Sequence, residues 1–129
     1  MGGTQRADGF IREPQNQTMA VLAVVQSVHG ASIRLTHERW SHIVESHDYM
    51  AGQMERVLET LTDPDCLANG VRDERLALKY YPTTLLGPKH SVVVYHEAEQ
   101  EGFVVTAFMT SKAEKLIKRG LQWQKSSTS

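Results

Sequence analysis

Leu35-Thr-His-Glu-Arg-Trp-Ser-His-Ile-Val-Glu-Ser-His47 and Glu74-Arg-Leu-Ala-Leu-Lys-Tyr-Tyr81 are the two stretches that decide the fold. In the first, apolar side chains recur from Trp40 to His47 at i, i+3, i+4 and i+7, which is the spacing of one helix face. Thr36 is a suitable N-cap for this helix. In the second stretch, apolar and polar side chains alternate, as they do in a half-buried strand. The chain is therefore predicted to combine helices with a sheet.

Periodicity and turn residues predict the remaining elements. Strands are expected over 20–28, 32–35, 66–69, 90–97 and 102–110. Helices are expected over 51–61 and 112–119. A short polar segment joins the last two strands, which should pair antiparallel. The expected fold class is α+β, with two N-terminal helices packed on one face of an antiparallel sheet of about four strands and a short C-terminal helix.

The length and composition predict a single domain. The chain has 129 residues, of which 40% are hydrophobic and 22% are charged, so it can bury one modest core. Residues 1–18 are polar and rich in glycine, and we expect them to form a disordered tail. The folded domain is expected over 19–124, with a frayed C-terminus over 125–129.

Charge and cysteine content narrow the function and the compartment. The formal net charge is -1, whereas proteins that hold nucleic acid by overall charge are usually strongly basic. Any nucleic-acid contact must therefore use a local patch. Cys66 is the single cysteine, so an internal disulfide is impossible, which fits a reducing cytoplasm. No run of 18 apolar residues occurs, so no membrane contact through a spanning segment is expected.

Cationic and hydroxyl side chains share one predicted side of the sheet. Arg75, Lys79 and Tyr81 fall on one side of their strand by period two. In the last strand Thr106 is expected to point to the same open face, because its neighbours are more apolar. With Arg72 at the edge, these residues would form a shallow basic surface. The alternative is an ordinary solvated sheet face, and sequence alone leaves both interpretations open.

The histidines of the first helix are the candidates for proton transfer. His47 lies near the centre of the helix face that holds Trp40, so it is either a core histidine or a site histidine at the junction of helix and sheet. His42 points roughly away from that face, and His37 lies toward its edge. Because these histidines are five residues apart, they do not share one helix face as metal ligands would. We predict no metal site and no cofactor.

Beyond these patterns, the chain resembles a known family over residues 32 to about 124. The stretch Leu35–His47, together with Leu76–Tyr81, Ser91–Tyr95 and Val104–Lys112, resembles the phage- and toxin-associated branch of the barnase–EndoU–colicin–RelE nuclease superfamily. The resemblance implies helices packed on a four-stranded antiparallel sheet, with catalysis on the open face. It also implies metal-independent RNA cleavage, in which a 2′-OH attacks the adjacent phosphate and leaves a cyclic phosphate.

The resemblance also implies roles for individual residues. His42 and His47 match the helix histidines, one of which would be general base or general acid. Arg75 and Lys79 match strand cations that would stabilise the phosphate in the transition state. The expected substrate-binding residues are Arg72, Tyr81, Thr106, Ser111 and Lys112, the last of which would join the final helix N-terminus in an anion site.

The predicted function is thus a toxin-like, metal-independent endoribonuclease. Its expected partners are RNA, an antitoxin or immunity protein, and a second copy of the chain in a homodimer. A first alternative is a non-catalytic relative that binds nucleic acid or protein. A second is a structural protein that dimerises through an exposed β edge. The acidic hairpin around 97–101 and the slightly negative net charge argue against strong RNA binding.

Overall fold

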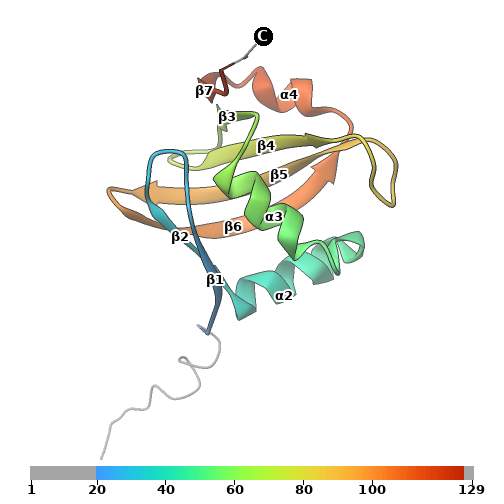
Figure 1. The fold of residues 1–129 in the computed structure, drawn as a ribbon, viewed down its shortest axis with the longest axis horizontal. Coiled ribbons are helices and arrows are strands. Elements are labelled where there is room, and N and C mark those ends of the chain that lie inside the picture. The colour runs from blue at the N-terminus through green and yellow to red at the C-terminus, as the bar shows by residue number, and fades with distance from the viewer. Residues whose placement is uncertain (1–19, 127–129) are drawn as a thin grey trace, which may run out of the picture.

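A computed structural model describes residues 20–126, in which seven strands form one mixed sheet (Figure 1). The predicted tail over 1–18 and residues 127–129 lie outside the described residues. The strands lie in the order β1-β2-β6-β5-β4-β3-β7, with β2 and β6 parallel and the other neighbours antiparallel. Their bounds are β1 (Val21–Gln26), β2 (Ser32–Thr36), β3 (Cys66–Asn69), β4 (Arg75–Tyr81), β5 (Lys89–Ala98), β6 (Glu101–Thr110) and β7 (Leu121–Gln124).

Three α-helices and one 3₁₀ turn accompany the sheet in this part of the chain. They are α2 (His37–Ser46), η1 (Asp48–Met50), α3 (Met54–Thr62) and α4 (Ala113–Ile117). The predicted N-cap is confirmed, because the Thr36 hydroxyl accepts a hydrogen bond from the Arg39 N–H at 3.2 Å. At the other end, the His47 N–H donates to the Ile43 carbonyl and closes α2. None of these helices is long and apolar enough to cross a membrane.

The predicted sheet of about four antiparallel strands is wrong, and helices make up less of the fold than was predicted. Two segments join the sheet in ways that local patterns do not encode. The β1–β2 hairpin extends one edge through parallel pairing of β2 with β6, although about 65 residues separate these strands in sequence. At the other edge β7 pairs with β3, although its sequence Leu-Gln-Trp-Gln carries little strand signal. The result is a mixed sheet in which strands outweigh helices.

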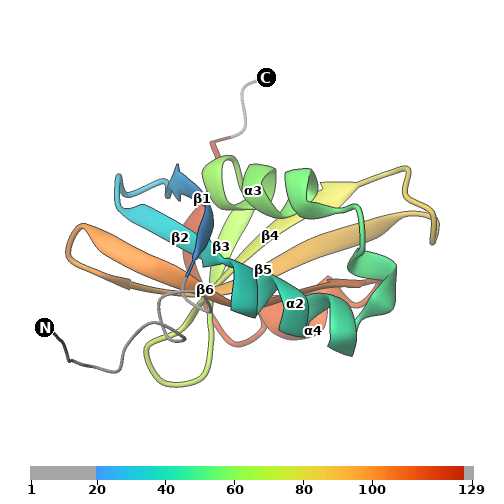
Figure 2. The same cartoon turned by 90° about the horizontal axis from the view of Figure 1, so that it is seen from below.

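Both faces of the sheet carry a hydrophobic core. On one face α2 and α3 bury Ile43, Val57 and Leu61 against Ala77 and Val93. On the other face, α4 covers Leu76, Leu78 and Val92 through Ala113. Figure 2 shows α3 and α4 on opposite sides of the sheet. Two covered faces explain why β5 carries the unbroken apolar run from Val92 to Val94.

The predicted basic face does not form, because its members lie on different sides of the sheet. Ala77 belongs to the core under α2 and α3, so Arg75, Lys79 and Tyr81 lie on that same side of the sheet. Thr106 neighbours Ala107 of that same core and pairs with Val94, so it lies on the α4 side. The prediction failed because the leucines of β4 face α4 rather than α2 and α3.

Candidate active site on the open part of the α4 face

One end of the α4-side face carries a row of polar side chains on three adjacent strands. The register places Tyr80 of β4 opposite His90 of β5, and His90 opposite Thr110 of β6. Cβ atoms of directly opposed residues lie about 4.5–5.5 Å apart, so these side chains are in reach of one another. The rings of Tyr80 and His90 have centroids 5.2 Å apart, and Tyr80 is 46% exposed. We call Tyr80, His90 and Thr110 the His90 row.

His47 reaches the same region from the opposite side. As the C-cap of α2 it ends the helix beside β6, where its ring lies 5.9 Å from the Phe108 ring and 5.6 Å from the Tyr49 ring. Phe108 is two residues before Thr110, so both side chains lie on the same side of β6. Two histidines from different elements therefore flank the Phe108–Thr110 segment. We call this region the histidine end of the sheet.

The edge of β6 explains why His47 has a fixed place. The pairing of β2 with β6 ends at Arg34 and Phe103, so among residues 20–126 no strand pairs with the rest of β6 on that side. Tyr49 of η1 fills this edge with its hydroxyl. The Met109 N–H donates to Tyr49 Oη at 3.3 Å, and Oη lies 3.5 Å from the Met109 carbonyl. Tyr49 Oη also lies 3.4 Å from His47 Nδ1.

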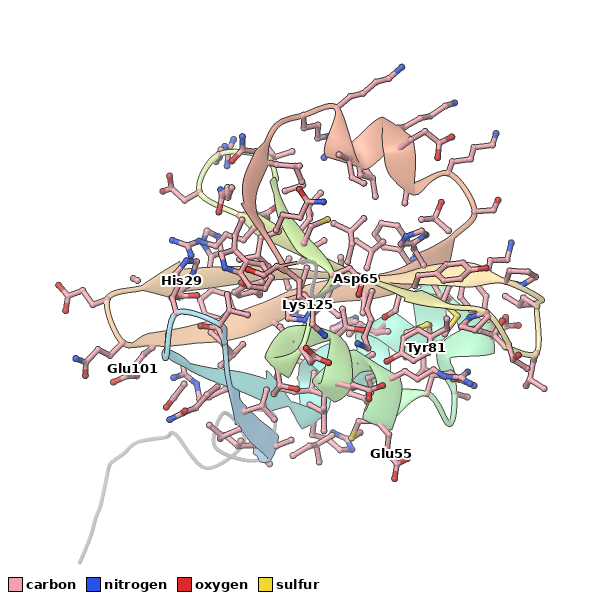
Figure 3. The ribbon with its side chains drawn as sticks, turned by 45° about the horizontal axis from the view of Figure 1, so that its top comes forward. His29, Glu55, Asp65, Tyr81, Glu101 and Lys125 are labelled. Atoms are coloured by element: carbon pink, nitrogen blue, oxygen red, sulfur yellow. The ribbon has the colours of Figure 1, made fainter. Side chains whose placement is uncertain are left out.

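A ridge of cationic side chains begins at the histidine end and leads away from it, since the Arg119 carbonyl accepts a hydrogen bond from Asn69, the β3 residue opposite Arg75. Four exposed cations lie in α4 and its flanks, and we call them the α4 ridge: Lys112, Lys115, Lys118 and Arg119. Glu114 is the one carboxylate within the ridge. The Lys112 N–H donates to Thr110 Oγ1 at 3.0 Å, which ties the start of the ridge to the His90 row. In Figure 3 nitrogen-tipped side chains project into solvent from this helix.

The placement of Lys112 alters one expectation. The last helix was expected over 112–119, but α4 spans only Ala113–Ile117, and Lys112 is its N-cap without a side-chain capping bond. So short a helix provides no separate anion site. Ser111 and Lys112 are exposed and lie between β6 and α4, so both adjoin the histidine end. Their contribution would come from the side chains themselves.

Lys79 and Tyr81, in contrast, both contact α3, and Figure 3 shows Tyr81 beside that helix. Lys79 Nζ donates to the Asp63 carbonyl at 2.9 Å and to Asp63 Oδ2 at 3.1 Å, at the C-cap of α3. The Tyr81 hydroxyl donates to Glu59, and the Arg56 guanidinium lies 5.0 Å from the centre of its ring. Burial, followed by the Glu59 hydrogen bond, raises the pKa of Tyr81 well above its usual value. Neither side chain faces the histidine end.

Arg75 and Arg72 lie at the opposite end of the sheet. Arg75 Nη1 is 3.6 Å from Glu97 Oε1 and 3.1 Å from Nδ1 of His29, in the β1–β2 turn. The Glu97 side chain is only 5% exposed. A cavity of about 370 Å³ nearby is lined by Arg72, Arg75, His96 and Glu97, among others. We call this region the acidic end, because its loops carry Asp73, Glu74 and Glu99 and β6 begins there with Glu101.

His42 and Thr106 are also separated from the predicted partners. His42 is 56% exposed on α2 and lies within 3.9 Å of Glu38 and 3.7 Å of Glu45. Thr106 lies on the α4 side, four residues before Thr110 and thus about 13 Å along the strand. Of the predicted catalytic set, His47 alone reaches the histidine end, and Ser111 and Lys112 are the predicted binding residues beside it.

The sequence reasoning missed His90, Tyr49, Tyr80, Phe108 and Thr110. The alternation of β5 does place His90 on the side of Val92 and Val94. The alternation alone does not show that this side of β5 faces α4. Tyr49 follows a helix end and has no periodic neighbour, so local patterns give no signal for its contact with β6.

Comparison with known proteins adds no assignment, since neither the family models nor the curated proteins nor the solved structures give a match to this chain. Within residues 20–126 there is also no group of three or more His, Cys, Asp or Glu side chains arranged to hold a metal ion. The chemical groups of the histidine end are therefore two imidazoles, the hydroxyls of Tyr49, Tyr80, Thr110 and the adjoining Ser111, and the cation of Lys112 at the start of the α4 ridge.

Proposed function

We propose that the protein is a metal-independent endoribonuclease whose active site is the histidine end. The observation that supports this most directly is the approach of His47 and His90 to one short segment of β6 from two sides. Imidazoles change protonation near neutral pH, so a pair of them can supply both a general base and a general acid. The resemblance of the chain to the barnase–EndoU–colicin–RelE superfamily supports the same activity.

In the proposed reaction one histidine removes the proton from the ribose 2′-OH, whose oxygen attacks the adjacent phosphorus. The other histidine protonates the departing 5′ oxygen. The P–O5′ bond breaks as the P–O2′ bond forms, giving a 2′,3′-cyclic phosphate and a free 5′-OH. The Lys112 ammonium and the Thr110 hydroxyl, on two residues whose backbone and side chain are hydrogen-bonded to each other, would stabilise the added charge on the phosphate. DNA lacks the 2′-OH and would not be cut.

The charge distribution supports a local nucleic-acid contact despite the formal net charge of -1. The α4 ridge starts beside the site with Lys112 and carries three further cations and one carboxylate away from it along α4. Phosphate contacts of this kind position the backbone without reading sequence. The exposed Tyr80 ring offers a surface on which an unpaired base would stack.

The wider biological predictions follow from this activity. A toxin-like endoribonuclease would act in the cytoplasm, in agreement with the single buried thiol of Cys66. It would require an antitoxin or immunity protein, which we expect to cover the histidine end. A homodimer would use the edge strand β1, where Val21, Leu22 and Val24 are exposed.

The decisive experiment is cleavage of a single-stranded RNA of mixed sequence in EDTA. We expect wild type to release products with cyclic phosphate ends. His47→Ala and His90→Ala should each lower the rate by about 10²–10⁴-fold, the usual contribution of a general acid or base. The matched control is His42→Ala, which removes an exposed histidine from the same helix as His47 and should cleave normally.

The outcomes separate the candidate functions. Loss of activity in His42→Ala, with normal activity in His47→Ala and His90→Ala, would place the active site on the exposed side of α2 that carries His42. Intact RNA with wild type at high protein concentration would reject the nuclease proposal. In that case, retention of the same RNA on wild type but not on Lys112→Ala would support the non-catalytic, nucleic-acid-binding alternative.

A further inference from the structure

Tyr49 has one hydroxyl and three hydrogen-bonding neighbours. Met109 N lies 3.3 Å from Tyr49 Oη, the Met109 carbonyl 3.5 Å, and His47 Nδ1 3.4 Å. A phenol carries one hydrogen and accepts through its lone pairs. The Met109 amide can only donate and the Met109 carbonyl can only accept. The protonation of His47 Nδ1 therefore decides whether all three contacts are hydrogen bonds.

Only one arrangement satisfies all four groups. If Nδ1 carries a hydrogen, Tyr49 Oη accepts from His47 Nδ1–H and from the Met109 N–H, and its own hydrogen goes to the Met109 carbonyl. If Nδ1 is bare, the phenol hydrogen must go either to His47 or to the Met109 carbonyl. One contact then lacks a hydrogen, which leaves a part-buried acceptor unsatisfied.

We infer that Tyr49 is a positioning residue that holds His47 with its hydrogen on Nδ1. This inference rests on the proposed function, in which His47 transfers a proton. With Nδ1–H donated to Tyr49, the Nε2 atom is left to take a proton from substrate and return it. The bond from Nδ1–H to Tyr49 persists when His47 is protonated, so the ring need not turn during a turnover.

The surroundings of His47 leave this role to Tyr49. Its described ring neighbours are Tyr49 and Phe108, and no ion pair within residues 20–126 involves His47. The nearest carboxylate in sequence is Asp48, which is exposed. Many catalytic histidines are oriented by a carboxylate at the second ring nitrogen. Here a tyrosine fixed to the backbone of β6 would replace it.

The test is the tautomer of neutral His47, read from long-range ¹H–¹⁵N spectra of the whole labelled chain. In wild type we expect the hydrogen on Nδ1, although free histidine favours Nε2. Tyr49→Phe keeps the ring and removes the hydroxyl, so it should shift His47 toward the Nε2–H form, quicken exchange of the Met109 amide and slow RNA cleavage at least tenfold. Tyr81→Phe, which removes a hydroxyl near α3, is the matched control and should change none of these.

Each outcome bears on a different statement. An Nε2–H tautomer in wild type, or a tautomer that Tyr49→Phe leaves unchanged, would overturn the positioning role whatever the activity. An Nδ1–H tautomer that depends on Tyr49, in a wild type that cleaves no RNA, would uphold the contact and reject the nuclease proposal. Normal cleavage by a Tyr49→Phe variant with the altered tautomer would overturn the catalytic part of the inference.

Discussion

The two ends of the sheet both carry histidines and cations, yet the contacts of these groups differ. At the acidic end Arg75 contacts both Glu97 and His29, and Glu97 is almost completely buried. At the histidine end, His47 and His90 adjoin hydroxyls, and within residues 20–126 no cation of the α4 ridge forms an ion pair. The acidic end thus offers charges that already neutralise one another.

This difference separates stabilising charge clusters from reactive ones. A cation paired with a buried carboxylate has little positive potential left for a phosphate. Removing that cation leaves the carboxylate buried and charged without a partner. Exposed cations without a carboxylate partner keep their positive potential for a ligand, and the imidazoles near them stay free to exchange protons with it. We therefore expect substitutions at the acidic end to change the free energy of unfolding, and substitutions at the histidine end to change activity.

The largest effect on stability is expected from Arg75→Ala. It leaves Glu97 buried without its cation, and the free energy of unfolding should fall by about 2–4 kcal/mol. Urea denaturation followed by far-UV circular dichroism measures this change. RNA cleavage per folded molecule should stay near that of wild type, because Arg75 is remote from His47 and His90.

A double mutant sharpens this prediction. Arg75→Ala with Glu97→Gln removes both charges, so it should recover much of the stability lost in Arg75→Ala alone. If Arg75→Ala abolished cleavage without lowering stability, the active site would belong at the acidic end, beside the cavity that Arg72 and His96 help to line.

The next effect is a loss of stability at alkaline pH that comes from Tyr95. Burial, followed by the charge of Glu97, raises the pKa of Tyr95 from 10.0 to about 12, although Arg75 opposes this rise. A tyrosine whose pKa is higher in the folded state stabilises the fold fully below pH 10.0, and this contribution is lost as the pH rises toward 12. Over that window wild type should lose about 2–3 kcal/mol that Tyr95→Phe does not lose.

The same variant tests burial at neutral pH. The Tyr95 hydroxyl is buried and makes no hydrogen bond of ordinary geometry with the described residues, although the Arg75 guanidinium is near enough to oppose the rise of its pKa. Tyr95→Phe should therefore be close to neutral below pH 10.0. Denaturation curves of both proteins across the alkaline range give the comparison. Parallel loss of stability in wild type and Tyr95→Phe would show that another group, such as Tyr81, causes the alkaline transition.

Local sequence patterns predicted the elements of this fold better than their arrangement. The cap at Thr36 and the antiparallel pairing of β5 with β6 are both confirmed, because neighbours within a few residues determine them. The parallel contact of β2 with β6 depends on segments far apart in the chain. No local pattern specifies such a contact.

The site shows the same division. His47 was identified from its helix spacing, but its partners come from β5, β6 and η1. Arg75, Lys79 and Tyr81 were grouped correctly by period two, yet their shared side was assigned to solvent instead of α3. Alternation states which residues lie together, whereas the side that they face depends on which helix covers it.

The smallest predicted effect is that of Lys79→Ala, which tests whether this lysine is structural. Its side chain is 15% exposed, and its ammonium binds the Asp63 carboxylate and carbonyl at the end of α3. Losing these bonds should lower the free energy of unfolding by about 1 kcal/mol and leave RNA cleavage unchanged.

The pH dependence gives this last prediction its control. Hydrogen bonds from Lys125 and Lys79 lower the pKa of Asp63 below its ordinary value of 3.8. The pair therefore stabilises the fold above that pH and is lost as the pH falls through the lowered pKa. The stability difference between wild type and Lys79→Ala should shrink in acid, and it should also shrink in high salt because Asp63 is half exposed. A stability difference that persists in acid would mean that Lys79 acts through its bond to the Asp63 carbonyl. Loss of cleavage in Lys79→Ala with unchanged stability would instead make Lys79 a catalytic cation on the face covered by α2 and α3.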